Sequence, residues 1–299
     1  AATDVGVAIV ELRRVFTKPG DKVLFSSPVY QNFYTWMRET HVEMVDVPFR
    51  IDSQSSDQTG WSHDWAGIEA AYKSGIAVHL LCSPHNPLGK VYTSEELLRI
   101  VELAKQYGVV VISDEIHAPL TFKEQPFIPF LSVSEAAAEV GVAVSAASKG
   151  WNIAGLKCAI IISQTEKMHE KLNQLPPALH YRASLLGAFA TVAAFEKGEP
   201  WLDQAIEILD ENRQLIANLI SARIPAVKYA MPHCSYLAWL DVSALNLGED
   251  PGAVLIEKAK VAFNSGHIYG ALGKSHVRFN FATSPAIITE AIERIARVL

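Results

Sequence analysis

The stretch with the clearest chemical potential surrounds Lys149. It reads Ser145-Ala-Ala-Ser-Lys149-Gly-Trp-Asn-Ile-Ala-Gly-Leu-Lys157 and lies between two apolar runs, 142–145 and 158–162. A lysine at the end of a buried strand lies in a low-dielectric environment, which lowers the pKa of its amine and makes it nucleophilic. Together with the hydroxyl of Ser148 and the cation of Lys157, this amine suits a cofactor that carries a carbonyl and a phosphate. The alternative is a surface loop with a solvated lysine.

Apolar runs alternate with helical patterns through the first 165 residues. Thr93 and Glu96 form a capping box at the start of the clearest helix, and the polar stretch 54–60 predicts an exposed loop. Short apolar runs bounded by turn residues and separated by helices indicate a parallel α/β sheet. The expected strands are 23–25, 76–82, 109–113 and 142–145, and the expected helices are 7–16, 65–72, 93–107 and 134–140.

Polar residues follow three of these predicted strands. Asn86 comes after the strand 76–82, Asp114 after 109–113, and Ser148 and Lys149 after 142–145. Ligands of parallel α/β sheets bind beyond the carboxyl ends of the strands. We therefore expect these side chains to meet in one site at that edge of the sheet.

Pyridoxal phosphate (PLP) is a cofactor of the kind that such a site suits. Asp114 could pair with its protonated pyridine nitrogen, or it is an N-cap or surface carboxylate. Asn86 could donate to the phenolic oxygen of the ring, or it only shapes an Asn-Pro turn. Tyr30 could stack on the face of the ring, whereas most of the aromatic residues that follow it are expected in the core.

Two further parts of the site are predicted at the ends of the chain. The backbone N–H groups of Val5 and Gly6, at a helix start, could hold the phosphate together with Ser148 and Lys157. Arg278, at the start of the predicted strand 277–281, could bind a substrate carboxylate with two parallel hydrogen bonds. The alternative for this residue is an arginine at the rim of the site.

From about residue 165 the pattern changes. Helices are expected at 165–175, 183–197 and 201–224, followed by strands at 236–241 and 277–281 and helices at 251–260 and 284–299. This order is typical of an α+β arrangement. We predict a large domain over 1–199, with connecting helices from about 165, and a smaller C-terminal domain over 200–299.

The composition excludes several classes of protein. The 299 residues are 49% hydrophobic and carry a net charge of -6, without a block of basic residues, which argues against nucleic acid as a partner. No apolar run approaches the ~20 residues that span a bilayer. Cys82, Cys158 and Cys234 lie apart in apolar stretches, so we expect reduced cysteines, no structural metal and a cytoplasmic protein without a signal peptide.

The order of these pieces resembles fold type I PLP enzymes of the class I/II aminotransferase superfamily. Within it, the chain is similar to the cystathionine β-lyase (carbon–sulfur lyase) subgroup. The matching segments are Ser27-Pro-Val-Tyr30, Ser83-Pro-His-Asn-Pro-Leu-Gly89, Ser113-Asp-Glu-Ile-His117, Ser148-Lys-Gly-Trp-Asn-Ile-Ala-Gly-Leu-Lys-Cys158, Cys234-Ser-Tyr-Leu-Ala-Trp-Leu-Asp241 and Arg278-Phe-Asn-Phe-Ala282.

The resemblance implies a role for each predicted site residue. Lys149 would bind the cofactor covalently, Asp114 would contact the pyridine nitrogen and Arg278 the substrate carboxylate, with Asn86 at the phenolic oxygen and Tyr30 on the ring. Two positions depart from the pattern of many aminotransferases, because His117 replaces a tyrosine and Lys157 replaces an arginine. Lysine still supplies charge to a phosphate, but without the planar fork of arginine.

Family members also carry a segment before the point at which this sequence starts, so we expect a fragment or a truncated product. The resemblance implies a homodimer and a small amino-acid substrate. The expected reaction is β-elimination from cystathionine or a related S-substituted cysteine. Transamination uses the same residues and remains an alternative, as does a non-catalytic protein-binding role.

Overall fold

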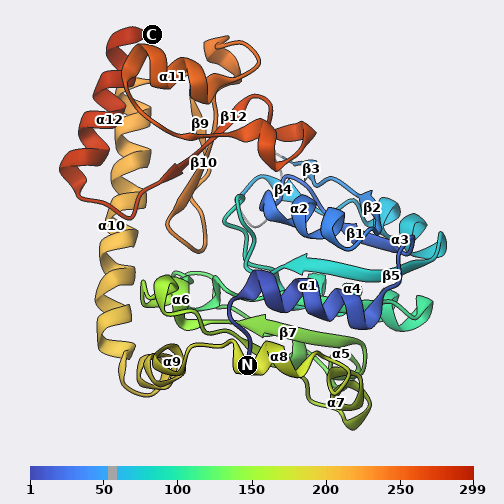
Figure 1. Ribbon diagram of the computed structural model, residues 1–299. Coiled ribbons are helices and arrows are strands. Elements are labelled where there is room, and N and C mark those ends of the chain that lie inside the picture. Colours follow the sequence, from blue (N-terminus) through green and yellow to red (C-terminus); the bar gives the residue numbers. More distant parts are fainter. Residues whose placement is uncertain (53–58) are drawn as a thin grey trace.

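A six-stranded sheet lies at the centre of the larger part of the structure (Figure 1). The computed structural model describes residues 1–52 and 59–299. The strand order is β2-β1-β5-β6-β7-β8, and all neighbours are parallel except β7 and β8. This confirms the predicted mainly parallel sheet. The strands are β1 (Lys22–Phe25), β2 (Glu43–Asp46), β5 (Ile76–Cys82), β6 (Val110–Asp114), β7 (Gly141–Ser145) and β8 (Ile160–Ile162).

Helices cover both faces of this sheet, because side chains of successive strand residues point to opposite faces. In β5, Val78 and Leu80 pack into one core cluster and Leu81 into the other. The first face is covered by α1 (Val5–Phe16), α2 (Asn32–Glu39), α7 (Glu166–Leu172) and α8 (Pro177–Tyr181). The second is covered by α3 (Trp65–Lys73), α4 (Ser94–Tyr107) and α5 (Glu135–Val140).

The local signals in the sequence fix the ends of two helices. Thr93 Oγ1 accepts from Glu96 N at 3.2 Å and Glu96 Oε2 accepts from Thr93 N at 2.9 Å, which confirms the capping box of α4. Gly108 ends that helix with a left-handed φ of 70°. Ser284 caps α12 (Pro285–Val298), and a proline occupies its first position as expected.

A second, four-stranded antiparallel sheet carries the C-terminal part of the chain, in the order β11-β12-β10-β9. Its strands are β9 (Lys228–Tyr229), β10 (Leu237–Asp241), β11 (Asn264–Ser265) and β12 (His276–Asn280), and they share a core with α10 (Glu199–Arg223), α11 (Pro251–Ala259) and α12. Figure 1 shows α10 running from α9 (Leu185–Lys197), beside the large sheet, up to this smaller layer. We propose 199/200, at the start of α10, as the domain boundary.

The structure adds elements that the sequence analysis missed. The edge strand β2 has no buried residue, so its sequence lacks the apolar run of an inner strand. Helix α8 interrupts the segment before α9, and β3 (Arg50–Ile51) pairs with β4 (Trp61–Ser62). Most of the loop predicted at 54–60 lies outside the described residues. In the described part of the chain, no helix has the length and apolar character needed to cross a membrane.

Candidate active site

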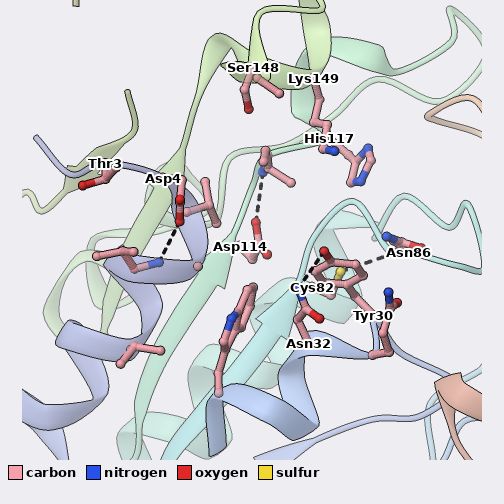
Figure 2. A pocket seen from close by; sticks show the side chains of 18 of the residues that line it. Thr3, Asp4, Tyr30, Asn32, Cys82, Asn86, Asp114, His117, Ser148 and Lys149 are labelled. Atoms are coloured by element: carbon pink, nitrogen blue, oxygen red, sulfur yellow. Dashed lines mark hydrogen bonds between the residues drawn. The ribbon is translucent and has the colours of Figure 1, made fainter. Parts of the chain in front are cut away.

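A cavity of about 760 Å³ lies where the carboxyl ends of the large sheet's strands meet the second sheet. The register pairs Cys82, the last residue of β5, with Asp114, the last residue of β6. All ten residues predicted for the site line this cavity, and Figure 2 shows several of them from close by. They are Val5, Gly6, Tyr30, Asn86, Asp114, His117, Ser148, Lys149, Lys157 and Arg278.

Lys149 reaches the cavity from the short helix α6 (Ala147–Gly150), which follows β7 directly. Burial lowers the pKa of its amine, and the nearby guanidinium of Arg278 lowers it further. The carboxylate of Asp114 acts in the opposite direction but is the smaller effect. The local environment therefore favours the neutral, nucleophilic form of this amine, in the direction that the sequence indicated.

Asp114 is almost completely buried at the end of β6. Its Oδ1 accepts a hydrogen bond from Ile116 N at 3.2 Å. Burial raises the pKa of the carboxyl to about 7, although this hydrogen bond and Lys149 both lower it. A buried carboxylate of this kind gains stability when a cation is placed against it, as a protonated ring nitrogen would be.

Arg278, in the middle of β12, is held by two amide oxygens. Its Nη1 donates to Asn86 Oδ1 at 2.9 Å, and its Nη2 donates to Asn264 Oδ1 at 2.9 Å. Because the oxygen of Asn86 is already engaged, its amide N–H₂ is the part that remains to donate toward the cavity. The contact also ties the loop after β5 to the second sheet.

The N-terminus of α1 forms another part of the cavity wall. Asp4 caps this helix by accepting from Val7 N at 2.9 Å, and Lys157 Nζ lies 3.3 Å from Asp4 Oδ2. Asp4 was not predicted as part of the site, although an aspartate before a helix is an ordinary N-cap signal. Its carboxylate brings a negative charge to the corner where Val5, Gly6 and Lys157 were expected to bind a phosphate.

Aromatic and imidazole rings line the middle of the cavity. Tyr30 follows β1, and its hydroxyl accepts from Asn32 Nδ2 at 2.9 Å (Figure 2). His117 is buried, its Nδ1 has no hydrogen-bond partner among the described residues, and burial lowers its pKa to about 3. The imidazole is therefore neutral at physiological pH. Tyr236, which was not predicted as part of the site, also lines the cavity. Its ring lies edge to face with that of His117, with the ring centroids 6.2 Å apart.

The fold recurs in known proteins. The family model for aminotransferase class I and II matches residues 2–295.

The chain belongs to the class I and II aminotransferase family.

Several proteins that are similar to this chain are named cystathionine beta-lyase. A Mycobacterium tuberculosis protein provisionally named cystathionine beta-lyase is 39% identical, in an alignment covering 99% of this chain and 76% of the relative. Cystathionine beta-lyase of Corynebacterium glutamicum is 34% identical, over 95% of this chain and 73% of the relative. The structure of cystalysin from Treponema denticola, which contains pyridoxal 5'-phosphate, has a TM-score of 0.90 at 27% identity and covers 99% of this chain and 75% of that chain. The fold class predicted from the sequence is confirmed.

Proposed function

We propose that this chain is a PLP-dependent carbon–sulfur β-lyase that cleaves cystathionine or a related S-substituted cysteine. With cystathionine and water, the products are a thiol, pyruvate and ammonia. The observation that carries the proposal is the meeting of Lys149, Asp114 and Arg278 around one cavity. The names of the relatives, with 34% identity over 95% of this chain in one case, support this activity over others of the family.

The residues of the cavity fit PLP. Asp114 is a buried carboxylate that suits a ring nitrogen, and the amide of Asn86 remains to donate to a ring oxygen. Val5 and Gly6 open α1, where backbone N–H groups suit a phosphate, Lys157 contacts the cap of the same helix, and Ser148 also lines the cavity. When bound, PLP supplies an aldehyde that reacts with amines and a ring that accepts electrons from the bond being broken.

The side chains of this chain then have separate tasks. Arg278 binds the α-carboxylate of the substrate through its terminal nitrogens, whose directions Asn86 and Asn264 fix. The amine of Lys149 would remove the α-proton as general base, and burial shifts its pKa downward, toward the neutral form that this step needs. Asp114 would stabilise a positive charge at the ring nitrogen, because a buried carboxylate needs a cation to balance it.

Elimination and transamination both need the α-proton removed, so the same residues serve both reactions. We expect the chain to release pyruvate from cystathionine without any keto acid as amino-group acceptor. The measurement is pyruvate formation by purified protein with PLP, compared with and without an added keto acid. A strict need for the keto acid would identify an aminotransferase instead. A protein that shows no absorbance band of bound PLP would have a non-catalytic role.

The acidic cap of α1 gives a prediction for cofactor affinity. We expect Asp4→Ser to bind PLP about two- to fivefold more tightly, since serine also caps helices but brings no negative charge near the phosphate. Loss of the contact with Asp4 would also let Lys157 turn to the phosphate. Equilibrium titration of the cofactor-free protein with PLP measures the change. Asp250→Ser, at the cap of α11 far along the chain, is the matched control. Weaker PLP binding by Asp4→Ser would contradict the proposal that the phosphate binds at the start of α1.

We also propose a homodimer. Helix α9 exposes five large apolar side chains, with exposed fractions from 48% to 72%, at Leu185, Leu186, Phe189, Val192 and Phe195. An apolar face of this kind marks a contact surface in soluble proteins. Light scattering should give a mass twice the 32.8 kDa of this chain; a mass equal to one chain would refute the dimer.

The three buried free cysteines support a cytoplasmic location, which stays a prediction.

A further inference from the structure

Tyr269 lies at the joint between the two sheets. It ends a short 3₁₀ segment, Gly266–Tyr269, in the C-terminal half of the chain, and its side chain is completely buried. Its ring nevertheless belongs to the core cluster on one face of the large sheet, together with Trp239 of β10. The two rings lie edge to face with their centroids 5.4 Å apart. The residue therefore packs between the two parts of the molecule.

The face of this ring supports the guanidinium of Arg278. The Cζ atom of Arg278 lies 4.9 Å from the centroid of the Tyr269 ring, within the range of a cation–π contact. The two amide oxygens of Asn86 and Asn264 fix the terminal nitrogens of the same guanidinium. Arg278 Nε has no hydrogen-bond partner among the described residues, so the contact with the ring is a further restraint on this group.

The main chain at the same position is tied to the loop that presents Tyr30. Val29 N donates to the carbonyl of Tyr269 at 2.9 Å, and Tyr34 Oη donates to the same carbonyl at 3.3 Å. The next residue, Gly270, has a φ of +126°. A Cβ atom on it would lie 2.7 Å from Ser27 Cβ and 2.8 Å from Tyr34 Oη, so only glycine allows this close approach.

We propose that Tyr269 is a positioning residue for the substrate-carboxylate anchor: its ring holds the Arg278 guanidinium, and its carbonyl sets that anchor at a fixed distance from the loop carrying Tyr30. The inference rests on the proposed function, because it takes Arg278 as the group that binds the α-carboxylate. The tyrosine hydroxyl is buried without a partner among the described residues, so the ring face and not the hydroxyl performs this role.

The test compares Tyr269→Phe, which keeps an aromatic face, with Tyr269→Leu, which removes it. Each PLP-loaded protein is titrated with alanine, which has a carboxylate but no leaving group, and with ethylamine, which has no carboxylate. The change in the absorbance of the cofactor gives a dissociation constant for each ligand. We expect Tyr269→Leu to bind alanine about three- to tenfold more weakly with ethylamine unchanged, and Tyr269→Phe to match the wild type within about twofold.

A glycine pair tests the main-chain tie without changing the ring. Gly270→Ala should weaken alanine binding, since the added methyl group pushes against Ser27 and Tyr34. Gly75→Ala is the control, because Gly75 also has a positive φ, +93°, but no atom lies within 4 Å of its Cβ position among the described residues. This control should lower only the thermal stability.

The possible outcomes separate this inference from the proposed function. Alanine binding that is unchanged in both Tyr269→Leu and Gly270→Ala would overturn the inference, as would equal weakening of alanine and ethylamine, which indicates general loosening. In both cases the wild type still binds PLP and releases pyruvate, so the proposed function stands. A wild-type protein that takes up no PLP would refute the proposed function, and the inference with it.

Discussion

Lys149→Ala is expected to lose at least about 10³-fold in pyruvate release from cystathionine. The substitution removes both the amine that binds the cofactor covalently and the general base that takes the α-proton, and loss of a general base alone costs about 10²- to 10⁴-fold. Burial first, and then Arg278, lower the pKa of this amine, which is the direction that its proposed role needs. Steady-state pyruvate formation measures the loss, and the absorbance band of lysine-bound PLP should vanish with it.

A matched control separates this effect from a general change in the protein. Lys167 is exposed on α7 and does not line the cavity, so Lys167→Ala should retain the activity and the absorbance band. Ligand-free Lys149→Ala should unfold at the temperature of the wild type or above it, because it removes an amine whose protonated form burial disfavours. Pyruvate release by Lys149→Ala at the wild-type rate would refute the role of Lys149.

Asp114→Asn is expected to lose about 10²- to 10³-fold in pyruvate release. The amide has the shape of the carboxylate but no charge, so the positive charge on the ring nitrogen loses its partner in a buried setting. Breaking a buried ion pair costs about 3–5 kcal/mol, and each 1.4 kcal/mol is tenfold in rate. The measurements are kcat for pyruvate release and the PLP titration, and an unchanged kcat would show that the carboxylate does not contact the ring.

The same variant should have the opposite effect on the stability of the ligand-free protein. Burial raises the pKa of Asp114 in the folded state from 3.8 to about 7, so the folded state holds this proton more tightly than the unfolded state. Ionisation of this group therefore lowers the free energy of unfolding by up to about 4 kcal/mol as the pH rises from about 4 to 7. The loss persists above pH 7.

Asparagine does not titrate, so ligand-free Asp114→Asn should be the more stable protein above pH 7, and the gap should close at lower pH. Thermal unfolding of both proteins between pH 4 and 8 measures the difference. Burial raises the pKa of the neighbouring Glu115 to about 7 as well, and the charge of Asp114 adds to that shift, so the measured difference includes the response of Glu115. Equal stability of the two ligand-free proteins at all pH values would contradict a buried, uncompensated carboxylate.

The positions of the main strands and the convergence of the site were predictable because both depend on local patterns. Apolar runs bounded by turn residues predicted the strands now seen as β1, β5, β6 and β7, and the order of elements predicted their parallel pairing. Parallel strands present their carboxyl ends at one edge, so Asn86, Asp114 and Lys149 had to come together. The short and exposed strands β2, β3, β9 and β11 lack such a pattern and were missed.

By itself, the sequence determined the chemistry available to this protein: an amine after one buried strand, a carboxylate after another, and an arginine on a strand near the other end of the chain. Only the tertiary structure decided which groups meet. Arg278 and Asn86 are 192 positions apart, and Lys157 and Asp4 are 153 apart. Neither these contacts nor the cation–π contact between Arg278 and Tyr269 follows from local periodicity, because they depend on how the second sheet packs against the first. Periodicity encodes the faces of each element, whereas contacts between distant loops are set by the packing of those faces.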